Sequence, residues 1–332
     1  MVHISDTHLL AGNTKLYGSI DSDAPLRLLM ERLVASGITI DALVFTGDLA
    51  DRGEEDAYRR LRSLVEPWAT KLNTQIVWVM GNHDEREAFS SVLTGNEPSS
   101  APQDAVSVVN GLRIIALDTS VPGYHHGELT LAQLEWLARE LETPAEKGTL
   151  LALHHPPIPT PIELMGLIEL EDQAALAAVV RGSDVRGILA GHLHYSTYST
   201  FAGVPISVAA AACYNIDLIA PSTTILSAKT TGLAASLVHV YPEQVVFSEV
   251  PLDDVSEIMS YDASYRSVVE AMSAEERKAM FSKKDSEFNS HADQVQSGSR
   301  WSRCASCLGG TARNWQIPGR CQRTRSKPMK AT

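Results

Sequence analysis

The chain has 332 residues, 44% of them hydrophobic and 20% charged, which is long enough for one large domain with an extension or for two domains. Four cysteines are too few for a disulfide framework, and neither a signal segment nor an apolar run of the roughly 18 residues of a membrane span is present, so we expect a cytoplasmic protein. The net charge of -12 argues against a nucleic-acid partner, because a phosphate backbone is bound by Lys and Arg.

Short apolar runs alternate with amphipathic stretches over residues 2 to 252. Five of these runs end in a polar cluster, namely VHISDTH, DALVFTGD, QIVWVMGNHD, TLLALHHPP and RGILAGHLH. This pattern is typical of buried strands that carry polar residues at their carboxyl ends. Met1 lies only five residues before Asp6, which leaves a first strand that is short for the centre of a sheet and is compatible with a start further upstream.

Helical patterns lie between these runs. Residues 25 to 37 place leucines on one face, with a proline near the start and a glycine at the end. Residues 55 to 72 predict a helix that is interrupted or restarted at Pro67, and residues 130 to 142 predict one that begins with a capping box of Thr130 and Gln133. A further helix is expected over residues 172 to 181. The alternation of strands and helices predicts an α/β fold.

The pattern changes after residue 190, where VPISVAA, SLVHVY and VVFSEV favour antiparallel strands and a second sheet packed on the first. Beyond residue 252 the periodicity fades, and we expect residues 253–332 to form a largely irregular or disordered extension. From about residue 295 this extension carries eight basic residues and no acidic one, so the remainder holds 20 basic against 40 acidic residues. A solvated tail is favoured over weak contact with an anionic membrane, and over a zinc site at Cys304, Cys307, Cys321 and His291, whose spacing matches no standard set.

Seven residues with oxygen or imidazole ligand atoms follow the apolar runs. They are Asp6, His8, Asp48, Asn82, His154, His192 and His194. Each motif alone is also typical of a turn or of a structural histidine, but open α/β folds bind ligands outside the carboxyl ends of their strands. A set of carboxylate, amide and imidazole without thiolate suits a catalytic metal site better than a structural zinc site. Two metals bridged by a carboxylate can clamp both oxygens of a phosphoryl transfer and generate a hydroxide near neutral pH.

These five blocks, Asp-x-His, Gly-Asp, Gly-Asn-His-Asp, His and Gly-His-x-His, resemble those of the calcineurin-like metallophosphoesterase superfamily over about residues 1 to 252. The resemblance implies a four-layer αββα sandwich of two mixed sheets flanked by helices. It also implies two metal ions, Mn and/or Fe with Zn as a further option, bridged by Asp48. The implied ligands of the first ion are Asp6, His8, Asp48 and His194, and those of the second are Asp48, Asn82, His154 and His192.

His83 is not expected to be a ligand, because Asn82 already supplies the metal contact of its motif. An imidazole there can face the phosphate and donate a proton to the leaving alkoxide or stabilise charge, and a role only in orienting Asp48 or in packing is the alternative. His125 lies in the polar loop Gly-Tyr-His-His, which is either a substrate contact or an ordinary surface loop. The expected substrate-binding residues are Asn82, His83, His125 and His194.

The neighbours His154 and His155 are equally good ligands as far as the residues themselves show. The resemblance favours His154, and His155, which precedes a proline, would then support the loop. The structure must therefore decide which of the two imidazoles faces the other ligands.

The longer segments HISDTHLLAG, FTGDLADRGE, WVMGNHDE, LDTSVPGYHHGE, LHHPPIP and GHLHYS look like bacterial class III cyclic nucleotide phosphodiesterases within the superfamily. This resemblance implies a homodimer in which metal-activated hydroxide hydrolyses 3′,5′-cyclic AMP, with cyclic GMP as a second substrate, to the 5′-monophosphate. One alternative is a broader enzyme acting on 2′,3′-cyclic nucleotides or on other diesters and monoesters. An alternative of another class, a metal-free scaffold that binds partners, predicts eroded ligands, and all seven are present.

Overall fold

The computed structural model describes residues 1–253, 263 and 265–286. The chain divides into two compact units, Met1–Val255 and Ser256–Thr332, and the boundary proposed at residue 252 lies close to this division. Among the described residues, no helix combines the length and the apolar character that a membrane crossing requires.

A five-stranded mixed sheet contains both the first and the last strands of the first unit. Its strands, in spatial order, are β13 (Val245–Pro251), β12 (Ala234–Val240), β1 (Val2–Ile4), β2 (Ala42–Thr46) and β3 (Gln75–Val79). β1, β2 and β3 are parallel, whereas β12 runs antiparallel to both β1 and β13. The three-residue β1 therefore lies at the centre of the sheet, held between β2 and β12.

The second mixed sheet has six strands. In spatial order they are β4 (Ala105–Val109), β5 (Leu112–Leu117), β6 (Thr149–Leu153), β7 (Val185–Ala190), β9 (Val204–Val208) and β8 (Thr197–Phe201). The four central strands are parallel, and β4 and β8 are antiparallel edges. β10 (Asn215–Ile216) and β11 (Ala228–Lys229) form a separate antiparallel pair.

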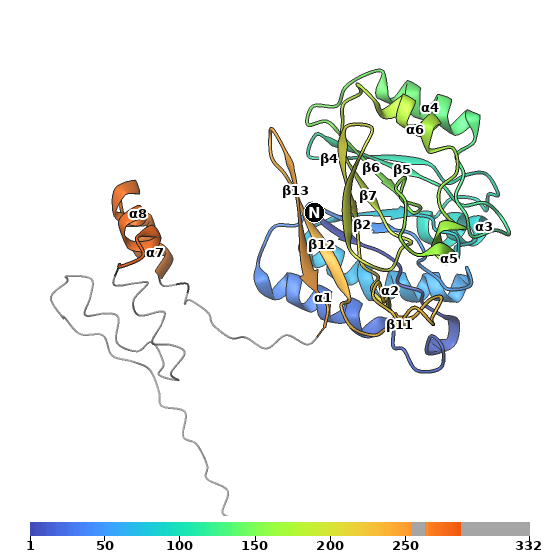
Figure 1. Cartoon of the computed structure of the whole chain (residues 1–332), viewed down its shortest axis with the longest axis horizontal. Coiled ribbons are helices and arrows are strands. Elements are labelled where there is room, and N and C mark those ends of the chain that lie inside the picture. Colours follow the sequence, from blue (N-terminus) through green and yellow to red (C-terminus); the bar gives the residue numbers. More distant parts are fainter. Residues whose placement is uncertain (254–262, 264, 287–332) are drawn as a thin grey trace, which may run out of the picture. The chain divides into compact units, whose positions relative to one another are not determined.

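Helices cover the outer face of each sheet (Figure 1). The first sheet packs against α1 (Asp23–Ser36), α2 (Glu55–Leu72) and the π-helix η2 (Phe89–Thr94), and the second against α4 (Leu131–Leu141), α5 (Glu163–Gly166) and α6 (Gln173–Val180). The short helices η1 (Ala11–Asn13) and α3 (Arg86–Ala88) lie in loops.

Alternation along the strands builds the layers. On β2, Leu43 and Phe45 belong to the apolar cluster shared with α1 and α2, whereas Val44 belongs to the cluster shared with the second sheet. Successive side chains of a strand point to opposite faces, so a strand buried on both faces needs the continuous apolar run that the sequence shows. The predicted four-layer αββα sandwich is confirmed.

The predicted helices are present, with one correction. α4 begins with the expected capping box, in which Gln133 N–H donates to the Thr130 hydroxyl over 3.2 Å. α2, however, continues through Pro67 without a break. Leu61, Val65 and Ala69 carry its buried face across the proline, and burying such side chains contributes roughly 1.5–3 kcal/mol for each large one. This packing offsets the cost of about 3 kcal/mol for a proline within a helix.

One prediction about the later chain is wrong in part. β12 and β13 form the expected antiparallel hairpin, but they complete the first sheet, whereas β9 lies in the second, antiparallel to β8 as expected and parallel to β7. The described part of the extension contains α7 (Tyr265–Ala271) and α8 (Ala274–Ser282), and the largely irregular character of residues 253–332 stays a prediction. Ser273 and Glu276 form a capping box at the start of α8, a local signal that fading apolar periodicity obscured. The basic tail from residue 295 and its cysteines lie outside the described residues.

Candidate metal centre

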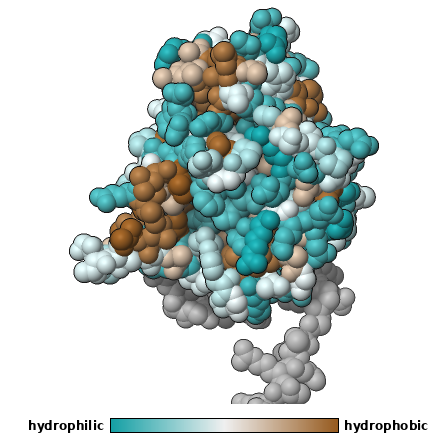
Figure 2. Space-filling model, turned by 90° about the vertical axis from the view of Figure 1, so that its right-hand side faces the viewer, coloured by the Kyte–Doolittle hydropathy of each residue, from teal (hydrophilic) through white to brown (hydrophobic). Residues whose placement is uncertain are grey.

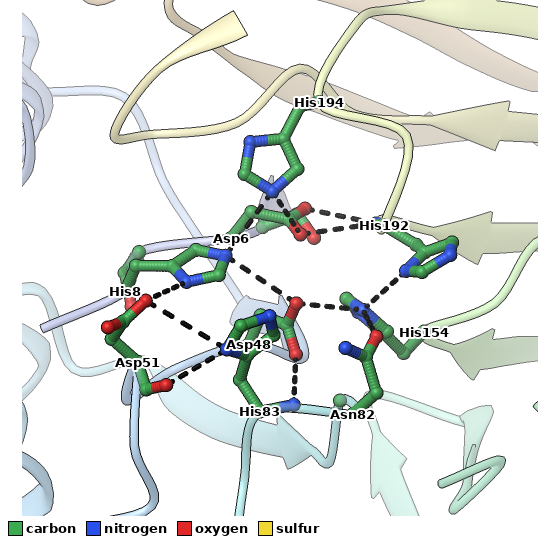
Figure 3. Close-up of polar contacts among 12 residues, drawn as sticks. Asp6, His8, Asp48, Asp51, Asn82, His83, His154, His192 and His194 are labelled. Carbon is green, nitrogen blue, oxygen red and sulfur yellow. Dashed lines mark hydrogen bonds and ion pairs between the residues drawn. The ribbon is translucent and has the colours of Figure 1, made fainter. Parts of the chain in front are cut away.

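The carboxyl ends of parallel strands from both sheets meet at one edge of the sandwich, where the predicted ligands converge (Figure 3). The residues come from five strand ends: Asp6 and His8 after β1, Asp48 after β2, Asn82 after β3, His154 after β6, and His192 and His194 after β7. The imidazole and carboxylate members are buried. The centre of the face drawn in Figure 2 is largely hydrophilic.

Strained backbone marks this cluster. Positive φ angles, between 42° and 70°, occur at Asp6, His8, Asp48, His192 and His194. A non-glycine residue in such a conformation costs of the order of 1–3 kcal/mol and persists only where the surroundings determine it. Strain concentrated at five of the seven predicted ligands indicates that the fold positions these side chains for a function.

Two glycines allow the loops to approach closely enough. A β-carbon at Gly81 would lie 2.2 Å from the backbone nitrogen of Asp48, and one at Gly191 would lie 1.9 Å from Oγ of Ser5. The loop after β3 therefore rests directly on the loop after β2, and the loop after β7 rests on the end of β1. Glycine is required at both positions because any side chain would separate the strand ends that carry the cluster.

Four of the predicted ligands form one group. Nε2 of His8 lies 3.3 Å from Nε2 of His194 and 3.5 Å from Oδ2 of Asp48. Nε2 of His194 lies 3.3 Å from Oδ1 of Asp6. Ligand atoms bound about 2.0–2.2 Å from a single ion lie roughly 3.0–3.5 Å apart, so these four atoms are spaced as the ligands of one metal.

The second group surrounds Nε2 of His154. This atom lies 3.2 Å from Oδ2 of Asp48, 3.1 Å from Oδ1 of Asn82 and 3.3 Å from Nδ1 of His192. Oδ2 of Asp48 thus belongs to both groups, as a bridging ligand would.

The outward nitrogens of the four histidines determine which atoms face the centre. Each lies at hydrogen-bond distance from an oxygen acceptor: His8 Nδ1 from Asp51 Oδ1 (3.0 Å), His154 Nδ1 from the Thr46 carbonyl (2.8 Å), His192 Nε2 from the Ile168 carbonyl (2.9 Å) and His194 Nδ1 from the Tyr214 carbonyl (2.9 Å). A carbonyl or carboxylate only accepts, so each outward nitrogen carries the proton. The inward nitrogen of a neutral ring then presents a lone pair, as in histidines that bind metals.

Facing lone pairs need a cation between them. The inward nitrogens of His8 and His194, and those of His154 and His192, face each other across 3.3 Å. Without a metal, a proton is the available cation. Burial opposes protonation of these rings, but the Asp48 carboxylate raises the pKa of His154 to about 9, and Asp6 raises the pKa of His194 well above its usual value. Burial lowers the pKa of His8 and that of His192. The donor set therefore fits a dinuclear metal centre.

Asp84 supports both metal-facing loops, a role that reasoning from the sequence missed. Its carboxylate accepts from the N–H groups of Leu49, Ala50 and Gly81 and from the Tyr58 hydroxyl, over 2.9 to 3.2 Å. Burial, followed by the nearby Asp48 carboxylate, raises the pKa of Asp84 to about 6. The available signal was its place as the last residue of Gly-Asn-His-Asp. This carboxylate ties the Asp48 loop to the loop that carries Asn82.

His83 lies beside the two groups without joining them. Its backbone N–H donates to Oδ1 of Asp48 over 2.8 Å, and Nδ1 of its ring donates to the Asp51 carbonyl over 2.9 Å. The side chain is 31% exposed, and its Nε2 has no hydrogen-bond partner within the described part of the chain. The backbone of His83 thus orients the Asp48 carboxylate, while the ring keeps one nitrogen free for a further hydrogen bond.

His125 and His155 occupy different positions. Nδ1 of His125, an exposed residue, accepts from the amide nitrogen of Asn82 over 2.9 Å, which turns the amide oxygen toward His154. The His155 ring is fully engaged, because its Nδ1 lies 2.7 Å from the Thr119 hydroxyl and its Nε2 donates to the His125 carbonyl over 3.0 Å. His154 therefore faces the ligands, and His155 supports the loop that carries His125.

His194 was also predicted to contact the substrate. Its outward Nδ1 donates to the Tyr214 carbonyl, and its Nε2 faces Asp6 and His8. The ring keeps no free nitrogen for a direct hydrogen bond, so this contact stays a prediction.

Comparison with known proteins identifies relatives of this arrangement. Residues 1–196 match the family described as calcineurin-like phosphoesterase. The chain is 56% identical to the "cAMP/cGMP dual specificity phosphodiesterase MT0825" of Mycobacterium tuberculosis over 256 residues, which cover 76% of this chain and 79% of that protein. It is 28% identical to the "3′,5′-cyclic adenosine monophosphate phosphodiesterase CpdA" of Escherichia coli, over 72% of this chain and 88% of that one. A dimetal phosphatase from Danio rerio shares the fold, with a TM-score of 0.53, 16% identity and coverage of 76% and 96%.

Proposed function

This chain belongs to the calcineurin-like phosphoesterase family, and we propose that it hydrolyses 3′,5′-cyclic AMP, with cyclic GMP as a second substrate, to the 5′-monophosphate at a dinuclear metal centre. The observation that carries this proposal is the sharing of one oxygen, Oδ2 of Asp48, between two groups of ligand atoms whose inward nitrogens face each other. The cyclic nucleotide rests on the likeness to relatives with that named activity.

The residues divide into two ligand shells. Asp6, His8, Asp48 and His194 would hold one ion, and Asp48, Asn82, His154 and His192 would hold the other. Two ions held there supply Lewis acidity and lower the pKa of a bound water toward neutrality. Mn and Fe are the ions that we expect, with Zn as the alternative, because mixed oxygen and imidazole ligands suit these metals.

The chain itself handles the leaving group and the phosphoryl oxygens. Hydrolysis to the 5′-monophosphate breaks the bond from phosphorus to O3′, so O3′ must receive a proton. The doubly protonated imidazolium form of His83 can supply it from Nε2, while its Nδ1–H donates to the Asp51 carbonyl and fixes the ring. Because Nδ1 of His125 accepts from Asn82, the His125 proton resides on Nε2, from which it can donate to a phosphoryl oxygen.

A kinetic comparison with metal analysis tests this proposal. We expect two metal ions per chain, and a kcat/KM for 3′,5′-cyclic AMP at least about tenfold above that for 2′,3′-cyclic AMP, a glycerophosphodiester or a simple monoester; tenfold corresponds to about 1.4 kcal/mol of transition-state binding. A higher value for another ester would establish the broader enzyme instead. A purified protein that holds no metal after reconstitution with Mn or Fe would establish the scaffold. The homodimer and the cytoplasmic location stay predictions.

A further inference from the structure

Two tyrosines extend the site on the side of the first metal. The Tyr214 ring packs against the His194 ring with centroids 4.4 Å apart and lies 6.1 Å from the His8 ring. The Tyr17 ring follows at 5.6 Å from Tyr214 in an edge-on contact, with the two hydroxyl oxygens 3.4 Å apart. An aromatic row thus leads outward from the ligands His8 and His194.

Tyr17 ends this row with an open ring. The residue is 72% exposed, although large aromatic side chains gain free energy when they leave water. Its contact with Tyr214 is edge-on, at an interplanar angle of 61°, so Tyr17 keeps exposed ring surface for another planar group. An exposed aromatic ring at the outer end of this row, next to Tyr214, is suited to stack on a ligand.

The turn that carries Tyr17 is rigidly held. Leu16 and Ile20 exchange both backbone hydrogen bonds, over 3.0 and 2.9 Å, and Leu16 is buried in an apolar cluster with Cys213. Tyr17 itself has a φ of 49°. A strained residue at the tip of a closed and anchored turn is one whose position the fold determines. The ring is therefore placed in advance, which reduces the entropy lost on binding a ligand.

A pocket beside the second group of ligand atoms suits an anionic nucleotide less well. This pocket of about 450 Å³ adjoins Asn82, and its lining includes the carboxylates of Glu55, Glu85 and Glu87. Arg86, the basic residue of that lining, is paired with Asp118 over 2.8 Å. The carboxylates of this wall repel an anionic nucleotide.

We propose that Tyr17, supported by Tyr214, is the platform on which the purine of the substrate stacks. This inference rests on the proposed function and assigns the base-binding part of the same site. Stacking uses the face of the base and tolerates different edges, so one platform accepts both adenine and guanine. Tyr17 is then a specificity-determining residue that selects nucleotides over phosphoesters without a base.

Binding of products to the metal-loaded full-length protein separates stacking from phosphate binding. The ligands are 5′-AMP, 5′-GMP and ribose 5-phosphate, which has the same sugar and phosphate without the base, and calorimetry gives each Kd. Tyr17→Ala should weaken 5′-AMP and 5′-GMP alike by roughly 5- to 150-fold, the range that corresponds to loss of one base–aromatic stack. Ribose 5-phosphate should change by less than about twofold on the same scale.

Two matched variants complete the test. Tyr17→Phe keeps the ring and should retain nucleotide binding, and Tyr124→Ala removes another exposed aromatic, on the loop of His125, and should leave it unchanged. The platform would be overturned if Tyr17→Ala bound nucleotides as tightly as the unaltered protein, or if it lost as much affinity for ribose 5-phosphate as for the nucleotides. It would also be overturned if Tyr17→Phe lost as much nucleotide affinity as Tyr17→Ala, or if Tyr124→Ala lost the most. Failure of the proposed function has a different signature, because the unaltered protein would then bind 5′-AMP without hydrolysing cyclic AMP.

Discussion

Replacing Asp84 by asparagine should loosen the metal centre without touching a predicted ligand. In the native site Oδ2 of Asp84 accepts from Gly81 N–H over 2.9 Å, while Oδ1 accepts from Ala50 N–H and from the Tyr58 hydroxyl. An asparagine can place its oxygen at the Oδ1 position, where more donors converge. Its NH₂ group then faces the Gly81 N–H, and two donors oppose each other in a buried place.

The magnitude follows from this one mismatched pair. Leaving a buried donor unsatisfied costs about 1–3 kcal/mol, so the free energy of unfolding of Asp84→Asn should fall by about that amount. Asp84→Ala would leave three backbone N–H groups and the Tyr58 hydroxyl without their acceptor. The free energy of unfolding should then fall several times further than in Asp84→Asn, by an amount that approaches the total stability of a domain, about 5–15 kcal/mol. Gly81 precedes Asn82, so the asparagine variant should also bind the second metal more weakly.

Urea unfolding of the metal-loaded protein and metal content after dialysis measure the two effects. Asp104→Asn is the matched control, because Asp104 accepts from Asp118 N–H, just after β5, and from the Gln133 amide of α4, and it belongs to neither group of metal-facing atoms. The control should keep its stability, because both donors converge on Oδ1 and the asparagine oxygen can take that position, and it should keep both metals. The reasoning is refuted if Asp84→Asn keeps its stability and its metal, or if Asp104→Asn loses metal to the same extent.

Three further predictions concern the ligands and their packing. Asp48→Ala should abolish metal binding and activity together, whereas His83→Ala should keep two metals by elemental analysis and lower kcat by about 10²–10⁴-fold; metal loss in the latter would make His83 a ligand. In the folded metal-free protein the pKa of His154 is about 9, above its ordinary value of 6.5. Protonated His154 therefore contributes of the order of 3 kcal/mol to the free energy of unfolding below pH 6.5, and this contribution is lost as pH rises through 9. Urea unfolding at pH 6 and pH 9.5 should show this decline, and equal stabilities would contradict it. Gly191→Ala would put a methyl group 1.9 Å from Oγ of Ser5 and should destabilise the fold by about 1–3 kcal/mol with loss of metal, whereas Gly166→Ala, with nothing within 4 Å, should be tolerated.

The sequence pattern alone was sufficient to predict the layered fold, because the physical causes of its strands and helices are local. An apolar run such as Leu43 to Phe45 must be buried on both faces, and Thr130 with Gln133 can begin a helix from side-chain hydrogen bonds alone. The continuation of α2 through Pro67 was not predictable in this way, because the compensating contacts come from the sheet beneath it.

Sheet membership likewise depended on distant contacts. The hairpin of β12 and β13 is visible in the sequence as two apolar runs around a short turn, but nothing local says which sheet it joins. The pairing of Val2 with Leu237 across the whole first unit decides it. Backbone hydrogen-bonding groups are the same at every residue, so long-range pairing is selected by packing and topology.

For the site, the sequence by itself determined which residues converge, because strand-end residues of parallel strands must meet at one edge of their sheet. Only the tertiary structure decided which role each of these residues takes. The bonds from His155 to Thr119 and to the His125 carbonyl leave His154 to face Asp48, although the two histidines are adjacent and chemically identical. A side chain's role depends on which of its atoms have partners from other strands, and those partners lie tens of residues away in the chain.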